Sequence, residues 1–164
     1  MIFGDRYKKV LKKPSVYVDI INDMLAYKEQ GSSLYLLEND IGLHKLLHHP
    51  NSIFRNNLKG INTKVFTWKK GKMIENNIKE LLGIGAKVFL TEPIIQHYAL
   101  FENPKKIIRI LWAEKRHRDE RSSAYDCHHT PEPYPKVWKE LMEYFSDLEG
   151  KSEKVTLFAG MFFP

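Results

Sequence analysis

The chain has 164 residues, of which 43% are hydrophobic and 12% aromatic, and its formal net charge is +6. This length and apolar content predict one folded domain and exclude an intrinsically disordered chain. No apolar run approaches the roughly 20 residues of a membrane span, and the start MIFGDRYKKVLKK lacks the apolar core of a signal peptide. We therefore expect no membrane partner.

The charge balance and the cysteine content constrain the partner and the compartment. Lys and Arg number 26 against 20 Asp and Glu, and such an excess favours an anionic partner, most commonly nucleic acid. Cys127 is the only cysteine, so no internal disulfide can form. We therefore expect a reducing compartment, cytoplasmic or otherwise intracellular.

The first half of the chain predicts two helices and two strands. In chain order these are a helix over 16–30, a strand over 34–37, a brief helix over 41–49 and a strand over 63–68. Ser15 can cap the first helix and Gly31 supplies its left-handed stop. Pro50 ends the second helix, because the residue before a proline avoids helical geometry.

The second half continues the alternation of helices and apolar strands. The predicted elements are a helix over 73–85, a strand over 86–93, a helix over 94–101, a strand over 106–114, a long polar loop over 115–135, a helix over 136–150 and a strand over 153–160. Such alternation favours a mostly parallel sheet covered by helices. We predict a single three-layer α/β domain that spans residues 1–164.

Two basic clusters are candidate nucleic-acid contacts. Lysine and arginine side chains bind phosphates, and neighbouring aromatic rings such as Trp68 and Trp112 stack on bases. One cluster is the KKGK turn after the second predicted strand and the other opens the long polar loop. The candidate residues are Lys69, Lys70, Lys72, Lys115, Arg116, Arg118 and Arg121.

Carboxylates at the ends of apolar strands favour a second function. Glu38, Asp40, Glu92 and Glu114 all follow or end such strands, where sheet enzymes commonly place catalytic groups. One alternative is therefore a nuclease that uses Asp40, Glu92 or Glu114 with a divalent metal. Another alternative is a basic DNA- or RNA-binding protein without chemistry.

Histidines and the cysteine give weaker indications. His44 and His48 lie one helical turn apart, and Asp126-Cys127-His128-His129 also contains metal-ligand types. Neither group has the paired spacing of a zinc finger, so we predict no bound metal. Nucleotide-binding G-x-G-x-x-G and G-x-x-x-x-G-K-[ST] motifs are absent from the sequence, which disfavours a Rossmann dehydrogenase or a P-loop NTPase.

The order of segments in the second half carries a family resemblance. ENNIKELLGIGAKVFLTEPIIQHYALF precedes KIIRILWAEK, which contains Trp112 and Lys115, and CHHTPEPYPKVWKELMEYF then leads into VTLFAG. From about Ile74 to Phe158 this resembles the N6-adenine methyltransferases, in the branch that includes the RNA adenosine methyltransferase subunits. That family has a strand "vvWvK", a loop with "HSRKP", a helix and a last strand "ELFAR" or "DPFAGSG".

The resemblance implies a Rossmann-like methyltransferase topology with S-adenosylmethionine as cofactor. The cofactor would lie against the turn after the last strand, and the residues that would bind it are Phe158, Ala159, Gly160, His129 and Thr130. The family's (D/N)-P-P-(W/Y) motif orients the adenine amino group. Its counterpart here is Glu38-Asn39-Asp40-Ile41, so Asn39 or Asp40 would be the catalytic residue.

The tetrapeptide at 38–41 contains neither proline nor an aromatic ring. The resemblance therefore implies either an active adenine methyltransferase or a catalytically degenerate subunit that binds nucleic acid. With 164 residues the chain would lack a separate target-recognition domain. The resemblance thus implies a partner subunit or a homodimer.

Overall fold

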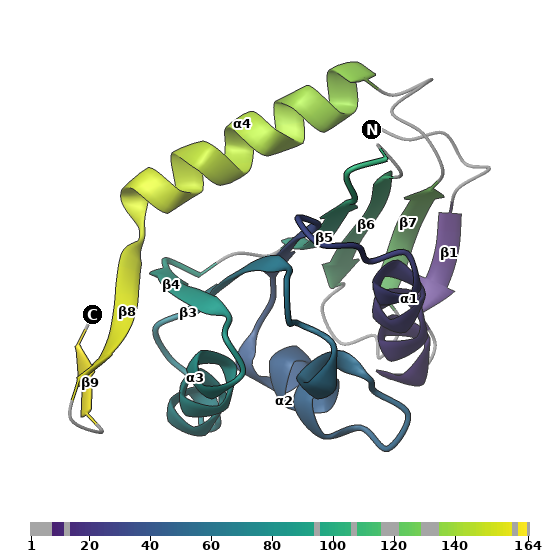
Figure 1. The fold of residues 1–164 in the computed structure, drawn as a ribbon. Helices are drawn as coiled ribbons and strands as arrows, with labels where there is room; N and C mark the ends of the chain where they lie inside the picture. Colours follow the sequence, from purple (N-terminus) through teal and green to yellow (C-terminus); the bar gives the residue numbers. More distant parts are fainter. Residues whose placement is uncertain are drawn as a thin grey trace.

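A computed structural model describes residues 8–11, 14–93, 96–105, 108–115, 122–128, 135–158 and 161–163 (Figure 1). Its helices are α1 (Pro14–Ala26), α2 (Asp40–His48), α3 (Ile74–Gly83) and α4 (Pro135–Lys151), with a short 3₁₀ turn at Phe54–Asn56. Its strands are β1 (Lys8–Leu11), β2 (Ser33–Leu37), β3 (Asn62–Trp68), β4 (Lys87–Thr91), β5 (Gln96–Glu102), β6 (Ile108–Lys115), β7 (Ser122–His128), β8 (Glu153–Phe158) and β9 (Met161–Phe163).

The described strands form one mixed sheet in the order β1-β7-β6-β5-β2-β3-β4-β8-β9. The three central strands β2, β3 and β4 are parallel to one another, and α2 and α3 connect them. All other neighbouring pairs of described strands are antiparallel. Parallel neighbours require a crossover connection, whereas antiparallel neighbours are joined by short turns.

The predicted mostly parallel sheet with a Rossmann-like methyltransferase topology is therefore wrong. Of the predicted helix over 94–101, residues 96–101 belong to strand β5, and the predicted polar loop over 115–135 contains β7. The described residues between β4 and β7 contain no helix, and β5, β6 and β7 pair as an antiparallel meander. The run IIQHYALF misled the prediction, since short apolar runs fit a buried strand and a helix equally well.

Most of the other predicted elements are confirmed. The structure contains helices within or close to 16–30, 41–49, 73–85 and 136–150, and strands within 34–37, 63–68, 86–93 and 153–160 to within a few residues. These segments have clear apolar periodicity or clear capping residues. Within the described part of the chain, no helix has the length and apolar character that crossing a membrane requires.

Buried side chains form a core on each face of the sheet. Alternate residues of β2 face opposite ways: Leu34 and Leu36 pack with α1, α2 and α3, whereas Leu37 packs with α4. Three helices thus cover one face of the sheet and α4 covers the other. A strand that is buried on both sides reads as a continuous apolar run, which explains the sequence LYLL.

Phe145 attaches α4 to its face of the sheet. Its side chain is 2% exposed, and its ring centroid lies 5.3 Å from that of Phe66 and 6.1 Å from that of Tyr98, both at near-perpendicular ring angles. Phe66 in turn stacks on Phe89 at 4.9 Å. Edge-to-face and stacked aromatic pairs stabilise a core beyond the area that they bury.

Replacing Phe145 by alanine should lower the free energy of unfolding by about 3–5 kcal/mol, the usual cost of a large core cavity. Urea denaturation followed by circular dichroism measures it. Glu143→Ala, on the exposed side of the same helix, is the matched control and should change stability by less than about 0.5 kcal/mol. Equal effects of the two substitutions would show that α4 is not held through Phe145.

Candidate active site

Several polar residues meet at one edge of the sheet because of the strand directions. The parallel strands β2, β3 and β4 all end there, and the antiparallel strand β5 begins there. Glu38 follows β2, Lys69 follows β3 and Glu92 follows β4, while His97 stands near the start of β5. We call this edge the carboxyl edge.

Glu38 and His97 form a buried pair at the carboxyl edge. The antiparallel register pairs Leu36 with Ala99 and Leu37 with Tyr98, and one further step sets Glu38 opposite His97. The Nδ1 atom of His97 lies 2.6 Å from Oε1 of Glu38, and the side chains are 14% and 9% exposed. This distance is within ion-pair range, and the contact becomes an ion pair when the imidazole ring is protonated.

The first turn of α2 fixes the Glu38 carboxylate. The backbone N–H of Asn39 donates to Oε1 of Glu38 at 2.9 Å. Gly42 leaves room for the carboxylate, since a Cβ at this position would lie 2.4 Å from Cδ and 2.5 Å from Oε1 of Glu38. Any larger residue at position 42 would therefore push the carboxylate away from its present place.

Two buried hydroxyl groups flank the pair. Tyr17 of α1 has a buried hydroxyl, and Thr67 of β3 lies beside Glu38 when the parallel register is extended by one residue. Neither hydroxyl has a hydrogen-bond partner among the described residues. Burial, and then the negative charge of Glu38, raise the pKa of Tyr17 well above its ordinary value near 10.

A buried imidazole beside a carboxylate can perform acid–base or nucleophilic chemistry. The carboxylate orients the ring through Nδ1 and stabilises the imidazolium ion, so that Nε2 becomes the nitrogen that exchanges a proton or attacks a substrate. The pair lies outside the carboxyl ends of parallel strands, where open α/β sheets commonly bind ligands. We therefore treat Glu38 and His97 as a candidate catalytic pair.

Asn39 and Asp40 are the residues predicted to orient a target amine. Their side chains accept hydrogen bonds from backbone N–H groups. The Oδ1 atom of Asn39 accepts the backbone N–H of Gly42 at 2.8 Å and thereby caps α2. The Oδ2 atom of Asp40 accepts the backbone N–H of Met73 at 3.3 Å. Both residues lie at the carboxyl edge beside Glu38.

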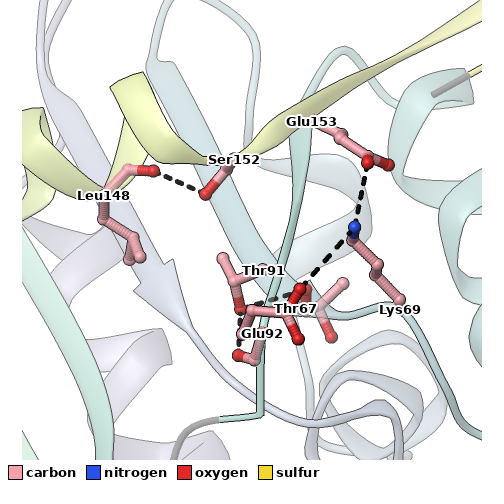
Figure 2. Close-up of polar contacts among 7 residues, drawn as sticks. All are labelled: Thr67, Lys69, Thr91, Glu92, Leu148, Ser152 and Glu153. Atoms are coloured by element: carbon pink, nitrogen blue, oxygen red, sulfur yellow. Dashed lines mark hydrogen bonds and ion pairs between the residues drawn. The ribbon is translucent and has the colours of Figure 1, made fainter.

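The lysines of the KKGK turn differ in their partners, and Figure 2 shows those of Lys69. Lys69 lies 2.9 Å from Glu153 and 3.8 Å from Glu92, and its hydrogen bond to Glu153 raises its pKa. Lys69 therefore attaches the start of β8 to the end of β3. Lys70 and Lys72 are exposed in the same turn.

The other predicted basic residues lie partly beyond the described residues. Lys115 ends β6 and pairs with Ser122 of β7 at the carboxyl edge. Arg116, Arg118 and Arg121 lie outside the described residues. Lys115 is the last residue of β6, so this strand ends at the carboxyl edge.

Of the residues predicted to bind S-adenosylmethionine, the structure describes only Phe158. Strand β8 is antiparallel to β4, with Glu153 opposite Leu90, so Phe158 ends at the edge opposite the carboxyl edge. Four other residues of that prediction lie outside the described residues: Ala159, Gly160, His129 and Thr130.

The remaining candidate ligands do not converge on a metal site in the described part of the chain. The rings of His44 and His48 lie 4.6 Å apart, and Nε2 of His48 contacts Oε2 of Glu80 at 2.9 Å. No group of three His, Cys, Asp or Glu side chains is close enough to hold an ion among the described residues. The carboxylates of the carboxyl edge have separate partners instead.

His97 was missed by the sequence analysis. It lies in the run that was predicted as a helix, and nothing in the sequence indicates that β5 pairs with β2 rather than with a closer strand. A usable signal exists in the alternation of His97, Ala99 and Phe101, which share one face of the strand. A histidine that opens an otherwise apolar strand face at its end is a candidate for chemistry.

Comparisons with known proteins supply no family for this chain. No family model matches it, and a search of curated proteins finds no match. The function is therefore argued from the residues at the carboxyl edge.

The buried Tyr17 predicts a loss of stability at alkaline pH. Above pH 10 the unfolded state releases the tyrosine proton while the folded state retains it, so the free energy of unfolding should fall by up to about 1.4 kcal/mol per pH unit. Tyr17→Phe should remove this part of the slope in urea titrations at pH 9 to 11. Tyr144→Phe, whose ring is more exposed, should remove less of it; equal slopes in the wild type and Tyr17→Phe would contradict the burial of this hydroxyl.

Proposed function

We propose that this protein hydrolyses phosphate esters in a polyanion such as nucleic acid, with His97 and Glu38 as its catalytic pair. The observation that carries the proposal is the 2.6 Å contact between Nδ1 of His97 and Oε1 of Glu38. A titratable pair in a low-dielectric position at the ligand-binding edge of a sheet is a functional-site candidate.

The histidine can cleave the ester by either of two mechanisms. It can accept a proton from an attacking water and return that proton to the leaving oxygen as the phosphorus–oxygen bond breaks. It can instead attack phosphorus itself, expel the leaving alcohol and pass the phosphoryl group to water in a second step. Both routes yield the same products and use Glu38 to stabilise the positively charged ring.

Basic residues near the pair support a phosphate-containing substrate. Lys70 and Lys72 are exposed in the turn that follows β3, and Lys115 ends β6 at the same edge. Together with the net charge of +6, the side chains of Lys70 and Lys72 would attract a polyanion and lower the repulsion between its phosphates. A neutral ester substrate would gain nothing from them.

The other functions predicted from the sequence have less support from the geometry. The methyltransferase resemblance stays a prediction, and no described contact brings its expected cofactor strand to Asn39 or Asp40. Binding of nucleic acid without chemistry would use the same lysines but would give the buried pair no role. We therefore favour hydrolysis over both.

Replacing His97 by asparagine should lower kcat by roughly 10²–10⁴-fold, since the acid–base nitrogen is lost. Glu38→Gln should also lower kcat, because an amide does not stabilise an imidazolium ion. Cleavage of a fluorescent single-stranded oligonucleotide, in EDTA and separately with Mg²⁺, measures both effects. His48→Asn removes an exposed histidine–glutamate contact at the far end of α2 and should leave the rate unchanged.

Two results of this assay would contradict the proposal. One is cleavage that persists in His97→Asn, and the other is the absence of cleavage of any phosphodiester by the wild type. Cleavage that is lost in EDTA and restored by Mg²⁺ would favour the metal-dependent nuclease instead. Quenching in alkaline denaturant distinguishes the two routes, because a phosphorus–nitrogen bond to His97 survives in base and is trapped only when His97 is the nucleophile.

Gly42→Ala should lower kcat and leave KM unchanged, because the added Cβ displaces the Glu38 carboxylate from the histidine. Gly83→Ala is the matched control, since a Cβ there meets nothing within 4 Å in the last turn of α3. Both substitutions favour helix, so thermal unfolding should show both variants folded. A normal kcat in Gly42→Ala would indicate that the position of Glu38 is not needed for catalysis.

A further inference from the structure

The turn between β3 and α3 lies against the start of α2. This turn, Lys69 to Met73, contains three lysines and one glycine. It follows β3 at the carboxyl edge. It contacts Asp40, which stands two residues after Glu38 in the sequence. We call it the lysine turn.

Asp40 holds the lysine turn through two contacts. Its Oδ2 atom accepts the backbone N–H of Met73 at 3.3 Å. Its carboxylate also fills the space over Gly71, where a Cβ would lie 2.5 Å from Cγ and Oδ2 of Asp40. A side chain at position 71 would therefore displace the Asp40 carboxylate from its contact with Met73.

Asn77 fixes the other side of the same contact. Its side chain is completely buried, and its Nδ2 atom donates to the backbone carbonyl of Asp40 at 2.8 Å. Asn77 also donates its backbone N–H to the carbonyl of Met73 at 3.0 Å. The start of α2, the lysine turn and the first turns of α3 thus form one hydrogen-bonded unit.

The lysines of this unit have different partners. Lys69 is paired with Glu153 and Glu92. Lys70 and Lys72 are exposed and have no carboxylate partner among the described residues. The fixed turn therefore presents two lysines to solvent at the edge that holds Glu38 and His97.

We propose that the lysine turn is a phosphate-binding element for single-stranded nucleic acid, and that Asp40 is the residue that positions it. Lys70 and Lys72 contact the phosphates, and Asp40 contributes by holding the backbone of the turn. The location of the bound strand beside His97 rests on the proposed function, but the binding itself does not.

The negative charge of Asp40 separates a positioning role from a purely electrostatic one. If only charge mattered, any neutral residue at position 40 would strengthen the binding of a polyanion, because a negative charge is removed. If Asp40 positions the turn, Asp40→Ala should weaken binding, whereas Asp40→Asn should not, because the amide oxygen still accepts the Met73 N–H. The two hypotheses predict opposite changes for Asp40→Ala.

The experiment measures the Kd of a fluorescent single-stranded oligonucleotide by anisotropy at several salt concentrations. All variants carry His97→Asn, so that cleavage does not interfere. Asp40→Ala should raise Kd by roughly 3–10-fold, and Asp40→Asn should give the parent Kd or a lower one. The double variant Lys70→Ala, Lys72→Ala should lower the slope of log Kd against log salt concentration by about two units, which corresponds to two lost phosphate contacts.

Gly71→Ala tests the same contact from the other side and guards against a folding defect at the start of α2. Its Cβ should displace Asp40 and raise Kd as Asp40→Ala does, while Gly83→Ala should not. The inference is overturned if Asp40→Ala binds as tightly as its parent or more tightly, or if the double lysine variant keeps the parent salt dependence. Binding that follows the expected order in a protein without cleavage activity would overturn the proposed hydrolysis alone.

In a cleavage assay with His97 intact, Asp40→Ala should raise KM and leave kcat unchanged. A role limited to overall stability would lower both activity and thermal stability in Asp40→Ala and Asp40→Asn alike. Normal activity in Asp40→Asn together with a raised KM in Asp40→Ala therefore assigns Asp40 a positioning role.

Discussion

The antiparallel pairing of β5 with β2 determines both the fold and the candidate site. It converts what would be a continuing parallel sheet into a meander of β5, β6 and β7. It also sets His97 directly across from Glu38, at the edge where the parallel strands end. A shift of this register by one residue would turn His97 to the α4 face and leave Glu38 buried without it. The chemistry proposed for this protein therefore depends on one strand register.

That register buries Glu38 beside His97, a pair that the free energy of folding alone does not favour. Removing a carboxylate and an imidazole from water costs free energy that their attraction repays only in good geometry, and apolar residues of similar size often serve as well. The Glu38–His97 contact brings two titratable groups together, and the hydroxyls of Tyr17 and Thr67 have no hydrogen-bond partner among the described residues. This arrangement is unfavourable for a purely structural element. Polar groups placed in this way are easier to explain as a site prepared for a substrate or an ordered water.

The sequence predicted the local structure better than the arrangement in space. Helices with a clear apolar face, such as α3, and strands bounded by turn residues, such as β3, follow from periodicity and capping. Strand β5 did not, because IIQHYALF is apolar on both faces and has no distinguishing period. Because β5 was predicted as a helix, the sequence could not predict the meander, the mixed sheet or the partner of Glu38. Strand pairing depends on contacts between distant segments, which one sequence does not display.

The strand-end carboxylates illustrate the same limit at the level of the site. The sequence correctly indicated that they follow strands, and the structure brings Glu38, Asp40 and Glu92 to one edge. Each then has a different partner: Glu38 contacts a histidine, Asp40 a backbone N–H, and Glu92 a lysine that also binds β8. Carboxylates with separate partners do not form a shared metal site. They divide the edge into the Glu38–His97 pair, the lysine turn that Asp40 contacts, and the Lys69 contacts that attach β8. The proposed cleavage of a charged strand would require the first two to lie side by side.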